Sequence, residues 1–228
     1  MSMNSMKEIF LRNRLFLVPY LLLLIICIFI LCFFDKSNIH IWTNNHNNLF
    51  FDYFFAFITN LGDGLFVLVV AFALLFYRYG HALLVFSTYI ISGLLVQFLK
   101  LIIFADSPRP KHYFEGIYNL HVVKGVDMLS SYSFPSGHSA SSFAMFLCLA
   151  FITKNKILQF LCFIMACLVA YSRVYLSQHF LIDSVTGSAI AVIVVLVYYY
   201  YYHLKLHGDW INKSLWILIY KKTKGKNQ

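Results

Sequence analysis

Six long apolar runs limit what this chain can fold into more than any other feature of its sequence. A helix needs roughly 20 apolar residues to cross the hydrocarbon core of a bilayer. Of the 228 residues, 61% are hydrophobic and 12% are charged, whereas an ordinary soluble domain has about 25% charged residues. The sequence therefore predicts an all-α, six-helix transmembrane bundle. The expected spans cover about residues 15–34, 65–77, 82–104, 136–153, 157–171 and 179–202.

The connections between these runs differ in composition. Residues 35–50 contain five Asn and two His and are expected to form an aqueous loop. Residues 51–61 place Asp52 among aromatic side chains, which is typical of a short interfacial helix. Residues 105–135 hold three of the four prolines, so we expect the longest aqueous loop there.

Lys and Arg are distributed unevenly over these connections. Twelve of them fall on one predicted side of the membrane and six on the other, so the positive-inside rule places both termini in the cytoplasm. We expect residues 1–203 to form one membrane-embedded domain and residues 204–228 a basic amphipathic cytoplasmic tail that binds anionic lipids. Topology and lipid attraction account for the net charge of +9, and no nucleic acid partner is expected.

A Pro-Ser-Gly-His sequence stands where the fourth run begins. It places the Ser136 hydroxyl and the amides of Gly137 and His138 at the start of an expected helix. The first amides of a helix have no partner within it, and the helix dipole favours negative charge there. This segment is therefore predicted to receive an anion.

A second group of polar residues lies where the fifth and sixth runs meet. His179 and Asp183 are four residues apart, so they are expected to share one helix face. Asp183 would then accept the Nδ1 proton of His179 and leave Nε2 as a nucleophile or base. Arg173 precedes His179 by six residues, and the chain must turn near Ser177 and Gln178 for both to reach one ligand.

Lys100 and Arg109 add two more cations after the third run, on the same predicted outer face. An unpaired charge on a spanning helix costs roughly 2.5 to 3.5 kcal/mol. Guanidinium forks such as those of Arg109 and Arg173 match phosphate oxygens. These residues therefore predict an outward-facing phosphate site.

Taken together, these residues resemble the type 2 phosphatidic acid phosphatase superfamily, whose signature is K-x6-RP, then PSGH, then SR-x5-H-x3-D. The second and third parts stand intact here, from Pro135 to His138 and from Ser172 to Asp183. The first part departs from the pattern, because eight residues separate Lys100 from Arg109. Lys111 is an alternative to Lys100.

The resemblance implies a lipid phosphatase that uses neither metal nor cofactor. His179 would attack phosphorus to form a phosphohistidine, Asp183 would orient it, and His138 would protonate the leaving oxygen and then activate water. The groups implied to hold the phosphoryl oxygens are Lys100, Arg109, Ser136, Gly137 and Arg173. The expected location is a bacterial cytoplasmic (inner) membrane, with the site on the periplasmic or extracytoplasmic face.

The substrate is left open among undecaprenyl pyrophosphate, lipid A, phosphatidylglycerol phosphate and phosphatidic acid. Lys111, His121 and Lys124 would suit a second phosphate or a large anionic head group, which favours a diphosphate or lipid A.

Other classes of function compete with hydrolysis. A lipid phosphotransferase would form the same phosphohistidine but transfer its phosphoryl group to a second lipid or sugar. A transporter should show discontinuous helices in paired halves, and the sequence has no such symmetry. An inactive binding protein would normally lack one of His138, Arg173 and His179, and all three are present. No pair of the remaining His has the spacing of a zinc site, so no metal is expected.

Overall fold

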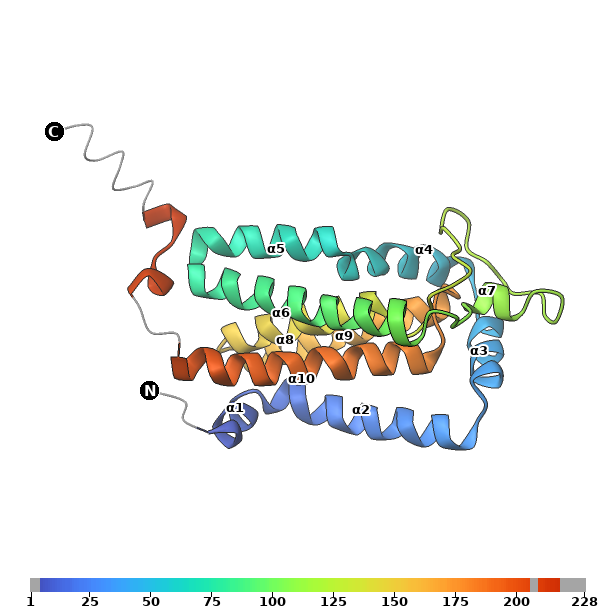
Figure 1. The fold of residues 1–228 in the computed structure, drawn as a ribbon, viewed down its shortest axis with the longest axis horizontal. Helices are drawn as coiled ribbons and strands as arrows, with labels where there is room; N and C mark the ends of the chain where they lie inside the picture. Colours follow the sequence, from blue (N-terminus) through green and yellow to red (C-terminus); the bar gives the residue numbers. More distant parts are fainter. Residues whose placement is uncertain (1–4, 206–208, 218–228) are drawn as a thin grey trace.

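The structure, a computed structural model, describes residues 5–205 and 209–217. All regular secondary structure within these residues is helical, so the predicted all-α class is confirmed (Figure 1). The helices are α1 (Met6–Arg12), α2 (Arg14–Phe33), α3 (Lys36–Asn45), α4 (Leu49–Ile58), η1 (Thr59–Gly62), α5 (Gly64–Tyr77), α6 (Tyr79–Phe98), the π-helix η2 (Leu99–Ile103), α7 (Pro110–Tyr113), α8 (Gly137–Ile152), α9 (Lys156–Tyr175), α10 (Leu181–Lys205) and η3 (Asp209–Asn212).

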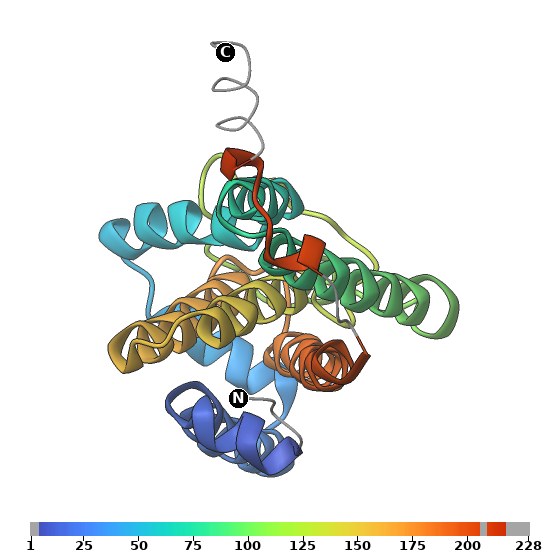
Figure 2. The same cartoon turned by 90° about the vertical axis from the view of Figure 1, so that its left-hand side faces the viewer.

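Helix α8 forms the centre of the bundle. It packs against α6, α9 and α10, and α2 lies at the edge of the bundle beside α9 and α10 (Figures 1 and 2). Twelve residues of α8 are buried, among them Ser139, Ala140 and Ala144. Small side chains of this kind let helix backbones approach closely. The short helix α8 is therefore enclosed by longer ones.

Helices form in all six ranges predicted as spans, but they are not equally suited to crossing a membrane. Four helices within the described residues are long and apolar enough: α2, α6 with η2, α9 and α10. Helices α4 and α5, with η1 between them, form a pair bent by 55° that would make a fifth span. Helix α8 has only 16 residues. Four or five candidate spans indicate a multi-pass membrane protein, and the six crossings and their orientation stay predictions.

The prediction of an aqueous loop over residues 35–50 was wrong, because helix α3 forms there. His40, Thr43 and Asn44 are buried on one face of α3, where they follow the spacing of a helix. His40 lies 3.1 Å from the Ser177 hydroxyl, and Asn44 donates to that hydroxyl at 3.2 Å. The polar residues of α3 thus hydrogen-bond inside the protein, whereas their polarity had indicated solvent.

The predicted tail is only partly described. Helix α10 continues to Lys205, beyond the expected boundary at residue 203, and most of residues 204–228 lie outside the described part. Within that part, Trp210 and Trp216 are exposed, while Ile211 is buried. The division into domain and lipid-binding tail therefore stays a prediction.

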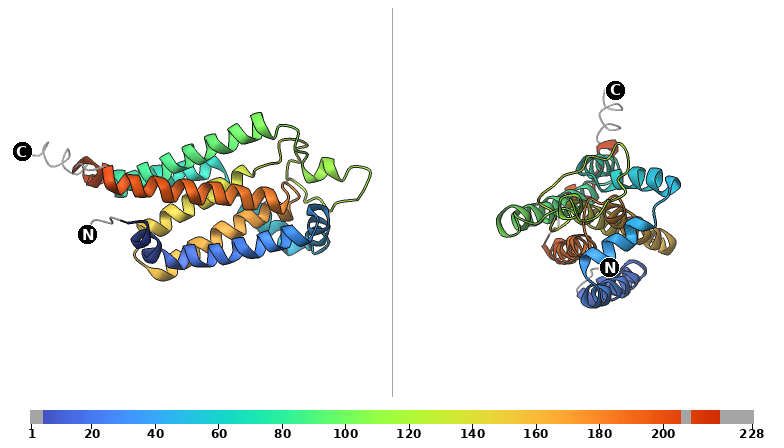
Figure 3. Two further views of the ribbon diagram at one scale, coloured as in Figure 1. Left: turned by 60° about the horizontal axis from the view of Figure 1, so that its bottom comes forward. Right: turned by 90° about the vertical axis from the view of Figure 1, so that its right-hand side faces the viewer.

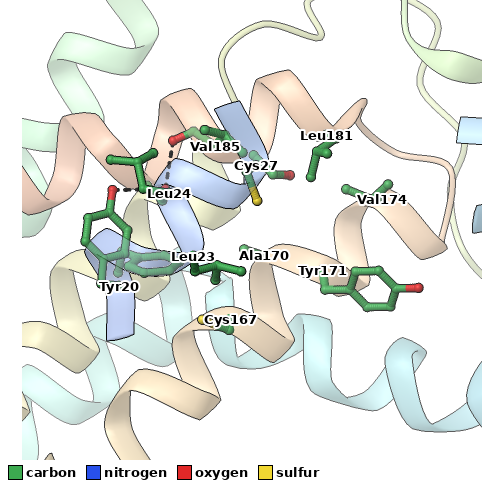
Figure 4. A pocket seen from close by; sticks show the side chains of 13 residues that line it. Tyr20, Leu23, Leu24, Cys27, Cys167, Ala170, Tyr171, Val174, Leu181 and Val185 are labelled. Atoms are coloured by element: carbon green, nitrogen blue, oxygen red, sulfur yellow. Dashed lines mark hydrogen bonds between the residues drawn. The ribbon is translucent and has the colours of Figure 1, made fainter. Parts of the chain in front are cut away.

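An apolar cavity of about 210 Å³ separates α2 from α9 and α10 (Figure 4). Tyr20 and Leu24 of α2 face Cys167 and Ala170 of α9 across it. No charged side chain lines the cavity. A phosphate needs cations or free amides, so this cavity suits hydrocarbon and the cations lie elsewhere.

Candidate phosphate-binding site

The N-terminus of α8 forms one wall of the candidate site. Ser136 caps this helix, and its fully buried hydroxyl oxygen accepts hydrogen bonds from the Ser139 amide at 3.3 Å and the Ser139 hydroxyl at 3.0 Å. Gly137 and His138 are half-buried, and a Cβ placed on Gly137 would meet nothing within 4 Å. Free helix-start amides beside open space can receive an anion. The Ser136 hydroxyl, predicted to join them, has only its own proton left to donate.

The chain turns between Arg173 and His179, as the sequence predicted. Helix α9 ends at Tyr175, and Ser177 adopts the left-handed backbone conformation with φ of 53°. His179 therefore precedes α10, which begins at Leu181. The expectation that His179 and Asp183 share one helix face was wrong, but the turn still brings His179 Nδ1 to 3.3 Å from the carboxylate of Asp183.

Asp183 is held by more than His179. Its Oδ2 accepts the Phe180 amide at 3.0 Å and the Ser133 hydroxyl in a very short hydrogen bond. Its backbone carbonyl accepts the Ser136 amide at 3.0 Å, which ties the start of α10 to the cap of α8. These bonds fix the carboxylate that in turn orients the imidazole.

The contacts of His179 define which ring nitrogen carries the proton. Arg109 Nη1 lies 3.5 Å from His179 Nε2, and a guanidinium can only donate. Nε2 therefore accepts, and Nδ1–H donates to Asp183. Burial lowers the pKa of His179 to about 3, so the ring is neutral at neutral pH. A neutral imidazole with a lone pair on Nε2 is the form that attacks phosphorus.

Two arginines lie beside this imidazole. Arg109 donates from Nε to the Ser131 carbonyl at 2.9 Å and from Nη1 to the Gln178 carbonyl at 3.0 Å. Arg173 donates from Nη1 to the Thr59 hydroxyl at 2.6 Å. Its Nε is buried and has no hydrogen-bond partner among the described residues. A buried donor without a partner is costly, and an oxyanion in the site would satisfy it.

The structure brings Lys100 into this cluster in spite of its unusual spacing. Lys100 lies in the π-helix η2, is buried, and acts electrostatically on Arg109, Arg173 and Asp183. A π turn holds more residues than an α turn, so it takes up part of the two-residue excess before Arg109. Lys111, the alternative, is exposed on α7.

His138 faces the same cluster from α8. It acts electrostatically on His179, Arg173, Lys100 and Arg109. It also borders a groove of about 320 Å³ that α6 lines from the other side, with Tyr89 among the lining residues. The two imidazoles and three cations therefore converge from η2, α8, the long loop, the end of α9 and the α9–α10 turn.

The residues predicted to bind the substrate head group do not belong to this group of imidazoles and cations. His121 Nε2 lies 2.9 Å from Oδ2 of Asp52, and the other oxygen of Asp52 accepts the Tyr175 hydroxyl at 2.7 Å. His121 therefore holds the long loop to α4 and α9, which argues against its predicted role as a head-group ligand. Lys111 and Lys124 are exposed on the long loop. This loop lies at the end of the molecule that faces the viewer in the right panel of Figure 3.

Three residues that hold the cations and His179 in place were missed by sequence reasoning. They are Thr59, Ser133 and Gln178, the last of which accepts hydrogen bonds from both arginines. Thr59 meets Arg173 across 114 positions of sequence, and Ser133 meets Asp183 across 50. Gln178 was expected only to permit the turn, yet its carbonyl oxygens accept from Arg109 and its Oε1 lies 3.5 Å from Arg173. No local pattern marks the contacts of Thr59 and Ser133 or the contact between Gln178 and Arg109, because these partners are 50 or more positions apart in the chain.

A family model of the PAP2 superfamily matches residues 81–206, more than half of the chain. The chain belongs to the PAP2 superfamily. The predicted resemblance is thus confirmed, and the matched range includes every residue of the cluster except Thr59. A comparison with curated proteins finds no significant match.

Solved structures of PAP2 proteins are similar to this one. Aquifex aeolicus LpxE has a TM-score of 0.63 and 24% identity, over 74% of this chain and 94% of LpxE. The transmembrane PAP2-type phosphatidylglycerolphosphate phosphatase from Bacillus subtilis has a TM-score of 0.60 and 23% identity, over 83% of this chain and 97% of that protein. At these identities the likeness establishes the fold. Within the described residues no three His, Cys, Asp or Glu side chains are grouped as a metal site requires.

Proposed function

We propose that this protein is a lipid phosphatase that works through a phosphohistidine on His179. The observation that carries the proposal is the His179 imidazole, bound to Asp183 through Nδ1, with Nε2 turned toward Arg109. Phosphoryl transfer depends mainly on positioning and on cations around the phosphoryl oxygens. The cluster supplies an oriented nucleophile and three cations.

The reaction would run in two steps. In the first, Nε2 of His179 attacks phosphorus, the bond from phosphorus to the lipid oxygen breaks, and protonated His138 gives its proton to that oxygen. In the second, His138 takes a proton from water, whose oxygen displaces His179 and releases inorganic phosphate. A general acid of this kind is worth roughly 10² to 10⁴ in rate.

Each cation has an expected place in this reaction. Arg173 Nε, the buried donor without a partner, would donate to a phosphoryl oxygen, and Lys100 and Arg109 would neutralise the others. The Gly137 amide and the Ser136 O–H would complete the cradle at the start of α8. The groove beside His138 would receive the lipid end of the substrate.

The substrate is proposed as a phosphate monoester or diphosphate of a membrane lipid: undecaprenyl pyrophosphate, lipid A, phosphatidylglycerol phosphate or phosphatidic acid. One structural neighbour is a phosphatidylglycerolphosphate phosphatase, which favours testing that lipid first. Because His121 is bound to Asp52, a preference for diphosphates or lipid A now depends on Lys111 and Lys124. The proposed location is a bacterial inner membrane, with the site on the extracytoplasmic face and both termini in the cytoplasm. Transfer of the phosphoryl group to a second lipid or sugar is the alternative.

Phosphate release from a panel of these lipids, with purified full-length protein, tests the proposal directly. We expect release that His179→Ala abolishes while membrane insertion is retained, because no other group would attack phosphorus. Orthovanadate, which mimics five-coordinate phosphorus, should inhibit, and EDTA should not. Substantial turnover by the variant, or strong loss of activity in EDTA, would contradict the mechanism. An added acceptor that gains the phosphoryl group would instead identify a phosphotransferase.

A further inference from the structure

The end of the bundle opposite the candidate site contains a partly enclosed pocket of about 340 Å³. It is formed where α5, α8 and α10 end and α6 begins, the end that faces the viewer in Figure 2. The polar residues that line it are Arg12, Tyr77, Arg78, His81, Lys154, Tyr199 and Tyr202. None of its described lining residues is Asp or Glu. The phosphatase mechanism uses none of these side chains.

The basic side chains of this pocket come from four separate segments. Arg12 ends α1, Arg78 joins α5 to α6, His81 lies in the first turn of α6, and Lys154 joins α8 to α9. Arg78 and Lys154 carry like charges, which repel each other in this partly enclosed space. A bound anion would remove this repulsion.

Two buried atoms in the pocket support a ligand independently of its charge. Arg78 Nε and His81 Nδ1 are buried and have no hydrogen-bond partner among the described residues. The other end of the Arg78 guanidinium is fixed, because Nη2 donates to the side chain of Asn212. The His81 ring is fixed as well, since it stacks on Tyr77 with 5.5 Å between ring centroids.

The close packing of this end holds the pocket in shape. A Cβ placed on Gly80 would lie 2.2 Å from the Tyr202 hydroxyl and 2.4 Å from the Ile211 side chain. The Tyr79 amide donates to the Lys213 carbonyl at 2.9 Å, so the segment around η3 closes over the start of α6. The pocket is thus shaped by tertiary contacts among the helix ends.

We propose that this pocket binds the phosphate group of an anion, independently of the proposed activity. Helices α6 and α10 are candidate membrane spans, so a pocket at their ends lies at the level of the lipid head groups. The phosphodiester of an anionic lipid and free inorganic phosphate share this chemistry. Arg78 and Lys154 would contact its oxygens.

The test is a titration of thermal stability in purified full-length protein, with apparent affinity taken from the dependence of Tm on ligand concentration. One arm adds phosphatidylglycerol to phosphatidylcholine micelles, and the other adds sodium phosphate at constant ionic strength. A response to the lipid alone identifies a head-group site, and a response to both identifies a general phosphate site.

The double variant Arg78→Gln/Lys154→Gln should weaken the apparent affinity about 25-fold, taking about fivefold for each cation near an anionic head group. The matched control Lys7→Gln/Lys213→Gln removes the same charge from exposed side chains that do not line the pocket, and should respond as the wild type does. If the double variant does not fold, Lys154→Gln alone, at an exposed position, should still lose about fivefold. Equal responses of variant and control, or no response of the wild type to either ligand, would overturn the proposal and assign these cations to the carbonyls at the helix ends.

Discussion

Gly187 of α10 lies where the two halves of the candidate site are joined. A Cβ added there would lie 2.3 Å from the Ser136 carbonyl oxygen, while ordinary contact begins at 3.4 Å. Gly187→Ala must therefore move α10 and the cap of α8 apart by the difference, about 1.1 Å, because the obstacle is backbone. His138 follows Ser136, and Asp183 lies one helical turn before Gly187. The substitution therefore separates His138, the proposed general acid, from His179, the proposed nucleophile.

The expected magnitudes follow from this displacement. Overpacking of this kind costs about 1 to 3 kcal/mol in stability, and a misplacement of about 1 Å between reacting groups costs about 100-fold in rate. Phosphate release under saturating substrate measures the loss in kcat, and a thermal melt measures the loss in stability. Gly93→Ala is the control for the melt, since an added Cβ there meets nothing within 4 Å and Ala favours a helix interior. A Gly187→Ala variant with wild-type kcat would refute the claim that close approach at this point sets the geometry.

Two further predictions address the cations and the buried imidazoles. Lys100→Gln should raise KM or lower kcat by tenfold or more, because Lys100 is buried beside the two arginines. Lys111→Gln should change the hydrolysis of a simple monophosphate lipid little. Equal effects of the two substitutions in the same phosphate-release assay would make Lys111 the phosphate ligand. Burial lowers the pKa of His40 to about 4 and that of His179 to about 3, below the unfolded value near 6.5. The unfolded chain therefore binds more protons between these values, so stability should fall as pH drops from about 6.5 to 4. His40→Gln should reduce that fall in Tm, and the exposed His112→Gln should not.

The sequence by itself determined the class of the fold and the family. Apolar runs of the length that a bilayer requires leave few alternatives to helices, because unpaired backbone groups are too costly in lipid. The fixed spacing of Ser136 to His138 and of Arg173 to Asp183 indicated a phosphate site and the PAP2 family. Both inferences use local order along the chain, which a single sequence displays in full.

Only the tertiary structure decided which polar residues face inward and how the parts of the site meet. The polar stripe of α3 was misassigned to solvent because its partner Ser177 is 137 positions from His40. The position of Lys100 beside the two arginines depends on the π-helix η2. The position of His121 depends on its hydrogen bond to Asp52 of α4. Hydrogen-bond partners far apart in sequence are chosen by packing, so composition and spacing do not reveal them.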